Sequence, residues 1–367
     1  MRITPRLSLC FLALALIPLA LATWMTTRQA EAGLRQETLN RVQALAEGKS
    51  GRLEDYVRER RDIVSALARS EQIADSLQQK TLAPSSQRYI QNYLSQFGFT
   101  ELLLLTPQGQ ILHSANGTQK VGASTDGLGL RGTEIARVFE GARMFLETEL
   151  SDFSASASSD EPVAYVGAPV LRDGRVIGVV ILQLDNRALS EVVNDYVGLG
   201  NTGEALVASP RGQDLQLITP TRNQADRRLS LSQEPALAQA VEGQPGSGEI
   251  SGGYLGAWRY LPSLRCGLLV RISRKEALAP VVQQRRLAVM VFSLTLLAVG
   301  VVATLVARSL TAPLLQLTQG ARQLAGGDLK HRLKVQASGE LGELAQSFNT
   351  MAEELDRMYT NIEDQVQ

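Results

Sequence analysis

The chain has 367 residues, of which 37 are basic and 37 acidic, so its formal net charge at pH 7 is +0. This balance gives no electrostatic case for binding to nucleic acid, and the length fits one large domain or about two to three smaller ones. Two apolar runs contain no charge, Leu7–Met25 and Leu287–Val306. A helix of about 20 apolar residues crosses a bilayer, so we expect transmembrane helices at residues 7–26 and 286–307.

Basic residues near the two runs predict the orientation of the chain. Arg2 and Arg6 precede the first run and several basic residues follow the second, so both termini are expected in the cytoplasm and the segment between the runs outside it. Arg285 and Arg286 lie on the outer side, against this rule, but a long translocated domain weakens the rule on its own side. The small-x-small sequence at residues 20–22 also fits a cleaved signal peptide, but the run exceeds a usual signal core and favours an uncleaved anchor.

The segment after the first run is expected to be helical. Apolar residues recur at helical spacing from Val42 to Leu67, which predicts one long helix over residues 27–80. At 1.5 Å per residue, about 50 residues would reach about 75 Å. Such a helix is long enough to run the height of an outer domain.

Beyond Phe99 the pattern changes to short strands and turns, and it occurs twice. Glu101–Leu112 reads ELLLLTPQGQIL and Glu204–Leu215 reads EALVASPRGQDL, each an apolar strand, a Pro/Gly turn and a second strand. A second pair of strands follows each copy, and the matched ranges are Ala164–Val170 with Ala257–Ser263 and Gly178–Leu184 with Gly267–Ser273. Three matches in the same order predict two copies of one α/β module.

Two tandem modules, after a long helix and between two spans, resemble the double Cache family of extracytoplasmic sensors. The resemblance covers about Thr27 to Val281 and rests on this layout and on strand phrases such as GAPVLRDGRVIGVVILQLD. It implies an outer region at residues 27–285 with two PAS-like antiparallel modules, a membrane-distal one at 81–190 and a proximal one at 191–281. In the family the distal module usually holds a small ligand.

The resemblance also implies a ligand site in the distal module. Asp185 ends the last strand, where the family has an aspartate that binds an amino group, and Tyr165 on the preceding strand is expected to close the pocket. Arg131, Arg137 and Arg143 fall in the intervening helical stretch and are candidates to hold a carboxylate as a bidentate pair. Each charged residue also fits a solvated surface position. The family's amino-acid-binding run, Arg-x-Trp-Tyr, is absent, which counts against an amino acid as the ligand.

The segment after the second run has two helical patterns separated by a glycine stop. Pro313 comes early in the first, Gly327 ends it, and Glu340-Leu341-Gly342 opens the second. Apolar residues then repeat at three-four spacing, as in a coiled-coil seam. The seam consists of Leu341, Leu344, Phe348, Met351, Leu355, Met358 and Ile362. Directly after a membrane span, this arrangement resembles a HAMP linker over about Arg308 to Asp356, and we assign it residues 308–360.

A HAMP linker implies a parallel four-helix bundle built from two chains, so we expect a homodimer that relays signals through these helices. The residues expected to carry the relay are Pro313, Gly327, Glu340, Leu341, Leu344, Phe348 and Met351. Residues 361–367 are expected to begin a coiled linker to an output domain. The fold class is therefore an α+β membrane protein, with two antiparallel modules outside, two transmembrane helices and a cytoplasmic HAMP bundle.

The sequence contains no recognisable catalytic constellation. His113 is the single histidine of the outer region, His331 belongs to the linker, and no nucleotide-binding glycine loop or metal-binding cluster appears. Cys266 lies in an expected strand and is expected to be a buried, unreactive thiol. We therefore expect no enzyme activity, metal or cofactor in this chain.

The function predicted from these features is that of a receptor in a bacterial cell membrane, with its sensor in the periplasm. It would bind a small solute outside and relay a conformational change to a cytoplasmic partner or output domain. A histidine kinase is the favoured output, and a chemoreceptor or a diguanylate cyclase is the alternative. An anchored extracytoplasmic hydrolase with a Ser–Lys arrangement is the competing class.

Overall fold

A computed structural model describes residues 3–156, 159–184, 186–212, 214–222, 228–230, 232–328, 332 and 339–366. The chain forms two compact units. One is Gly33–Ala279, and the other combines Met1–Ala32 with Pro280–Gln367.

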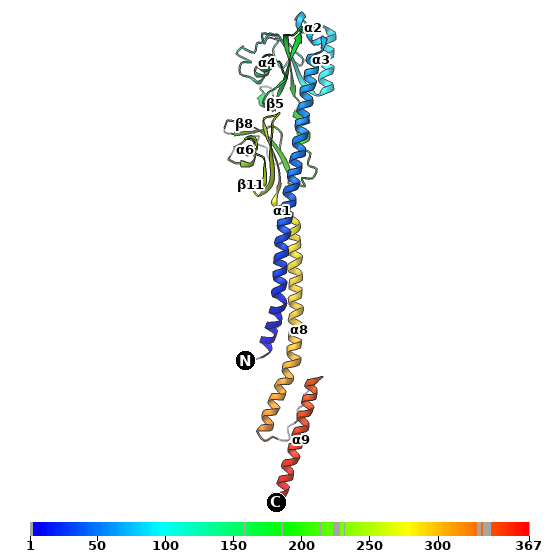
Figure 1. Cartoon of the computed structure of the whole chain (residues 1–367), viewed down its shortest axis with the longest axis vertical. Helices are drawn as coiled ribbons and strands as arrows, with labels where there is room; N and C mark the ends of the chain where they lie inside the picture. The colour runs from blue at the N-terminus through cyan, green and yellow to red at the C-terminus, as the bar shows by residue number, and fades with distance from the viewer. Residues whose placement is uncertain are drawn as a thin grey trace. The chain divides into compact units, whose positions relative to one another are not determined.

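The unit Gly33–Ala279 contains two antiparallel sheets (Figure 1). The first has the order β2-β1-β7-β6-β3. Its strands are β1 (Phe99–Leu105), β2 (Ile111–Ser114), β3 (Glu149–Leu150), β6 (Tyr165–Arg172) and β7 (Arg175–Leu184). The short strands β4 (Ser154–Ser156) and β5 (Ser159–Val163) pair separately. We keep the name distal module for the predicted residues 81–190, which contain this sheet.

The second sheet repeats this plan in the order β10-β9-β8-β13-β12-β11. Its strands are β8 (Glu204–Arg211), β9 (Asp214–Leu217), β10 (Arg228–Ser230), β11 (Gly246–Ile250), β12 (Tyr254–Leu261) and β13 (Cys266–Ser273). The hairpin β8–β9 corresponds to β1–β2, and β12–β13 corresponds to β6–β7. The repeat predicted from the sequence is therefore confirmed.

The register of the repeat differs from the sequence match by one residue for β7 and β13, and by two residues for β6 and β12. Leu102 pairs with Leu182 and the equivalent Ala205 pairs with Val270, so Leu182 corresponds to Val270. The sequence match of Gly178 with Gly267 instead makes Leu182 equivalent to Arg271.

Helices cover both faces of each sheet. The helix α1 (Ile3–Ala68) enters this unit at Gly33. The other helices are α2 (Glu71–Gln79), α3 (Pro84–Phe97), α4 (Glu134–Phe145), α5 (Asn186–Val193), α6 (Pro235–Val241) and α7 (Arg274–Ala277). One core joins α1, α2 and α3 to one face of both sheets. On the opposite faces, α4 packs on the first sheet and α6 on the second. Cys266 is buried in the shared core, as predicted, and burial raises the pKa of its thiol.

The helix predicted to continue to residue 80 is divided in two. The first part, α1, ends at Ala68, and α2 begins at Glu71. Ser70 causes the new start, because its side chain accepts a hydrogen bond from the backbone N–H of Ile73 at 3.4 Å, as an N-cap residue does.

The second unit is helical. The helix α8 (Ala279–Ala325) contains the apolar stretch Ala279–Val306, which is long and apolar enough to cross a membrane. It continues without a break past Pro313 and ends at Gly326-Gly327, where Gly327 has a φ of 94°. The helix α9 (Glu340–Val366) follows, and Figure 1 shows it running in the same direction as α8. Residues 7–26 lie within α1, and their role as a membrane span remains a prediction.

Candidate functional site

The ligand residues predicted from the sequence lie in different surroundings. Tyr165 begins β6 and is buried, with 8% of its surface exposed. Arg137 and Arg143 lie on α4, whereas Arg131 lies in the turn before this helix and is exposed. Asp185 lies outside the residues that the structure describes. The interpretation of Arg131 as helical is thus wrong, because Thr133 caps α4 and begins the helix two residues later.

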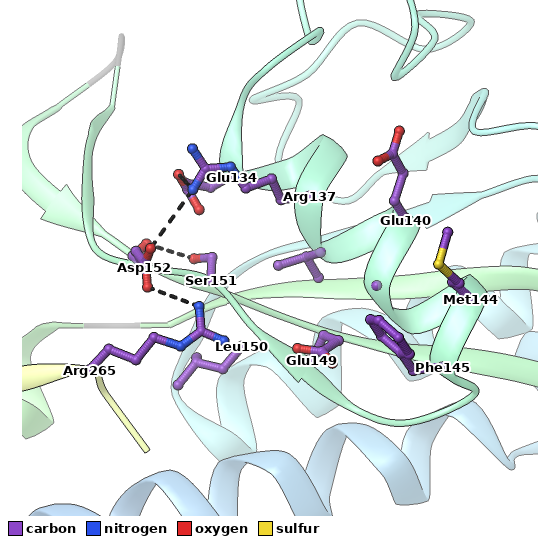
Figure 2. Close-up of a pocket in the computed structure, with 12 residues that line it drawn as sticks. Glu134, Arg137, Glu140, Met144, Phe145, Glu149, Leu150, Ser151, Asp152 and Arg265 are labelled. Carbon is purple, nitrogen blue, oxygen red and sulfur yellow. Dashed lines mark hydrogen bonds and ion pairs between the residues drawn. The ribbon is translucent and has the colours of Figure 1, made fainter. Parts of the chain in front are cut away.

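A cavity of about 370 Å³ lies beside α4 (Figure 2). Its lining is Glu134, Arg137, Val138, Glu140, Gly141, Met144, Phe145, Glu149, Leu150, Ser151, Asp152 and Arg265. We call it the α4 cavity. All of these residues belong to the distal module except Arg265, which comes from the β12–β13 turn of the proximal module. The cavity is therefore built by both modules.

Oppositely charged side chains alternate along one wall of the α4 cavity. Asp152 accepts from Arg265 at 3.4 Å and lies 3.8 Å from Arg137, which pairs with Glu134 at 3.0 Å. Figure 2 shows both guanidinium groups directed toward Asp152 from opposite sides. Burial raises the pKa of Glu134, Arg137 lowers it and the charge of Asp152 raises it further. The wall thus offers both a carboxylate and guanidinium groups to a ligand.

The three predicted arginines do not form one binding pair. Arg143 donates to the carbonyl oxygen of Pro107 at 3.3 Å and lies over the ring of Phe139, with 5.4 Å from its Cζ atom to the ring centre. Neither Arg143 nor Arg131 lines the α4 cavity, whereas Arg137 does. Arg137 and Arg143 are six residues apart on α4 and so lie on different faces of the helix, while Arg131 lies before the helix begins.

Glu101 is a buried residue on the same sheet as Tyr165. Its carboxylate accepts hydrogen bonds from Thr118, from Ser114 and from the backbone N–H groups of Leu102, Asn116 and Thr118. Burial alone would raise the pKa of Glu101, but these hydrogen bonds outweigh it and lower the pKa below its usual value of 4.5. Burial raises the pKa of Tyr165, and the negative charge of Glu101 adds to this effect.

The equivalent glutamate of the second sheet has a different partner. Glu204 accepts from Nε and a terminal nitrogen of Arg271 at 2.9 and 2.6 Å, and Glu234 accepts from the other terminal nitrogen. All three side chains are at least 91% buried. Tyr254 covers the guanidinium, with its ring centre 4.7 Å from the Cζ atom of Arg271. We call these three residues the Arg271 cluster, and it holds two carboxylates around one cation.

Sequence reasoning missed Glu101, Glu204 and the charged wall of the α4 cavity. A signal existed for the two glutamates, because both open the repeated strand phrase at the same position. A charged residue at the start of an apolar strand needs a buried partner. Asp152 and Arg265 had no such signal, since 113 positions separate them in the chain.

The residues predicted to relay signals lie on α8 and α9. Leu317 and Ala345 are buried against each other, and Leu341 and Phe348 pack on them. Leu344 and Met351 instead expose 53% and 55% of their surface. Pro313 lies inside α8 rather than near a helix start, because the membrane-spanning part and the following part form one continuous helix. Glu340 opens α9 and Gly327 ends the turn after α8, as predicted.

Comparisons with known proteins agree with this arrangement. Methyl-accepting chemotaxis protein McpA of Pseudomonas putida is 29% identical over 189 residues, 50% of this chain and 29% of that protein. Signal transduction histidine-protein kinase BaeS of Escherichia coli is 37% identical over 75 residues, 20% of this chain and 16% of that protein. The chain thus spans less than a third of the length of these curated relatives.

The sensory domain of the Campylobacter jejuni chemoreceptor Tlp3 is similar in structure, with a TM-score of 0.49 and 14% identity, over 67% of this chain and 98% of that one. Residues 26–281 match the Cache domain family and residues 305–357 match the HAMP domain, and neither match is to a catalytic domain. The chain belongs to the Cache domain family and joins its Cache domain to a HAMP domain, as a transmembrane signalling receptor with an extracellular sensor does.

Proposed function

We propose that this chain is the input half of a homodimeric receptor that senses a small solute bearing an ammonium group in its distal module. The observation that carries the proposal is the α4 cavity, to which both modules contribute charged groups. A solute bound there touches Arg265 of the proximal module as well as α4 of the distal one. Its binding therefore favours one arrangement of the two modules over others, which a receptor requires.

The lining of the α4 cavity supports the ligand class. It has four carboxylates and two guanidinium groups, together with the exposed apolar side chains of Met144 and Phe145. The excess of carboxylates repels a simple anion and attracts an ammonium group, while the guanidinium groups accommodate a carboxylate on the same molecule. A zwitterion or an amine with an apolar body fits these contacts. Tyr165 and Asp185 are proposed as further ligand residues, and Arg131 and Arg143 as peripheral ones.

Lys49 on α1 and Glu276 on α7 make polar contacts that attach these two helices to the modules. Lys49 on α1 donates to the carbonyl oxygens of Val192, Val193 and Asp195 at 2.8, 3.2 and 2.7 Å, and so fixes α1 to the connection between the modules. Glu276 on α7 accepts from the backbone N–H groups of Asn201 and Thr202, both at 2.8 Å. Since α7 leads directly into α8, a shift of the proximal module is passed toward the membrane.

The proposed dimer is supported by the exposed apolar side chains of α9. Leu344, Met351 and Met358 expose 53%, 55% and 56% of their surface in the single chain. They recur every seven residues, at one position of the predicted coiled-coil seam, which is buried only when a second helix pair covers it. A parallel four-helix bundle from two chains would bury them, with Pro313, Gly327, Glu340, Leu341 and Phe348 as the other relay residues.

We further propose that both termini are cytoplasmic, that residues 7–26 form a second span and that the sensor is periplasmic. The curated relatives that resemble this chain include a chemoreceptor and a histidine kinase, which supports an output of one of these two classes in the whole protein. The relay then acts on that output through α9.

Ligand binding is tested by thermal unfolding of the full chain in detergent with a panel of amines, zwitterions and dicarboxylates. We expect an amine or zwitterion to raise Tm, and Asp152→Asn to abolish the shift because it removes the carboxylate that both guanidinium groups share. Asp126→Asn is the matched control, since Asp126 is an exposed carboxylate of the same module that does not line the cavity. A shift that survives Asp152→Asn but is lost in Asp185→Ala would move the site to Asp185.

The dimer is tested by disulfide crosslinking in membranes. In a background with Cys10 and Cys266 replaced by serine and alanine, Leu344→Cys should crosslink two chains, and the yield should change when the ligand is added. A cysteine at Glu353, where the side chain is exposed and lies off the seam, is the control. Equal crosslinking at both positions would contradict the proposed bundle.

A further inference from the structure

A second cavity lies in the helical unit, where α1 and α8 run side by side. It has a volume of about 430 Å³. Its lining is Ala20, Thr23, Trp24, Thr27, Arg28 and Glu31 of α1, with Arg285, Ala288, Val289 and Phe292 of α8. We call it the Trp24 groove. On both helices the lining residues recur three and four apart, so each helix contributes one continuous face.

The Trp24 groove is apolar along its length and charged at one end. Thr23 and Thr27 donate their hydroxyl groups to backbone carbonyls one turn earlier, at 2.8 and 2.7 Å, which leaves the groove lined by carbon. Arg28 lies over the ring of Trp24, with 4.9 Å from its Cζ atom to the ring centre. Arg28 and Arg285 outnumber Glu31, so the charged end carries a net charge of +1.

The Trp24 groove lies at the ends of the two apolar stretches. Arg285 lies near the start of the apolar stretch Ala279–Val306, and Trp24 lies at the end of the first apolar run. Tryptophan and arginine are enriched where a helix leaves the hydrocarbon core, with the apolar part of the side chain toward the core and the polar part toward the headgroups. With residues 7–26 as a span, on which this inference rests, the charged end of the groove lies at the level of lipid phosphates, and Ala20 and Phe292 lie deeper.

We propose that the Trp24 groove binds an anionic phospholipid, with its phosphate held by Arg28 and Arg285 and one acyl chain lying against Trp24, Val289 and Phe292. Charge complementarity selects this occupant, because a cationic end joined to an apolar groove matches a headgroup of net negative charge joined to an acyl chain. The proposal also accounts for Arg285, which is a basic residue on the side of the membrane where such residues are disfavoured. A bound lipid would hold α1 and α8 together where the signal enters the membrane.

The test uses the full chain in nanodiscs and the fluorescence of Trp24. The chain has 2 tryptophans, and Trp258→Phe leaves Trp24 as the sole emitter. Brominated phosphatidylglycerol or brominated phosphatidylcholine, each at a low mole fraction in unlabelled phosphatidylcholine, quenches an adjacent indole. We expect several-fold stronger quenching by phosphatidylglycerol. Arg28→Gln combined with Arg285→Gln should make the two lipids equal, whereas Arg286→Gln, which does not line the groove, should preserve the preference.

Three outcomes would overturn the proposal. Equal quenching by both lipids in the unaltered groove means that the arginines do not select a headgroup with a net negative charge, since both lipids carry a phosphate. No quenching by either lipid means that protein covers the groove, as the helix of a second copy would. Loss of the preference in excess inorganic phosphate means that the arginines bind the free anion. Native mass spectrometry of the unsubstituted chain with phosphatidylglycerol supplies the same comparison without Trp258→Phe, and its result does not depend on any solute bound by the Cache domain.

Discussion

Replacing Arg271 with methionine should severely destabilise the proximal module. Methionine preserves most of the buried volume but removes the one cation of the Arg271 cluster. Glu204 and Glu234 would then remain as two buried carboxylates without a counter-charge. The second carboxylate oxygen of each is already buried and accepts no hydrogen bond within the described part of the chain. The three hydrogen bonds to Arg271 are therefore the main contacts that offset their desolvation.

The size of the effect follows from this burial. Removing one partner of a buried ion pair costs about 3–5 kcal/mol, because an uncompensated charge stays in a medium of low dielectric constant. Two carboxylates share Arg271, so we expect the upper end of that range, about 5 kcal/mol. Adding Glu204→Gln and Glu234→Gln to Arg271→Met removes the uncompensated charges and should restore most of the loss, since buried ion groups are often replaced by neutral ones at little cost.

Urea unfolding of the compact unit Gly33–Ala279, followed by circular dichroism, measures these differences. Arg259→Met is the matched control, because Arg259 lies on the neighbouring strand and its pair with Glu47 is 32% and 52% exposed. An exposed pair of this kind contributes under about 1 kcal/mol. If Arg271→Met lowered the free energy of unfolding by no more than Arg259→Met, the cluster would not be a buried, mutually dependent ion group and the reasoning would fail.

Three further substitutions test other parts of the unit by the same urea titration. Lys49→Met leaves three carbonyl oxygens without their shared donor and should cost about 3 kcal/mol, whereas a loss under about 1 kcal/mol would mean that water replaces the ammonium group. Glu101 has a folded-state pKa below 4.5, so its carboxylate stabilises the fold above that pH and the contribution is lost as the pH falls through the folded-state pKa. Glu101→Gln should therefore flatten the acid limb of the stability curve, and an unchanged limb would refute this role. Gly178→Ala places a Cβ atom 2.5 Å from the carbonyl oxygen of Leu105 and should cost about 1–3 kcal/mol, unless β7 can shift away.

Much of the architecture is encoded in local sequence patterns. The hairpins that begin at Glu101 and Glu204 were predictable because each pairs strands joined by a short Pro/Gly turn. The end of α8 at Gly327 was predictable for a similar reason, since glycine readily adopts the positive φ of a helix stop. Features set by neighbouring residues therefore needed no knowledge of the tertiary structure.

The candidate site was harder to predict because its residues come together only in the folded chain. Asp152 meets Arg265 across the boundary between two modules, and the intervening chain gives no pattern that links them. Arg137 was found among three arginines because it lies on α4, but its partners were not. The break between α1 and α2 was missed because Ser70 interrupts an otherwise helical pattern, and a single capping residue is easily read as part of the helix.

The continuity of α8 has a mechanical consequence. A helix of 47 residues measures about 70 Å, and its ladder of backbone hydrogen bonds makes it stiff along its axis. Pro313 lacks the N–H that would complete one bond of that ladder, so this position is a soft joint in a stiff rod. A push or a pull along such a rod is expected to reach its far end, whereas a sideways tilt is expected to be absorbed at the joint. We therefore expect α8 to pass axial displacement in preference to bending.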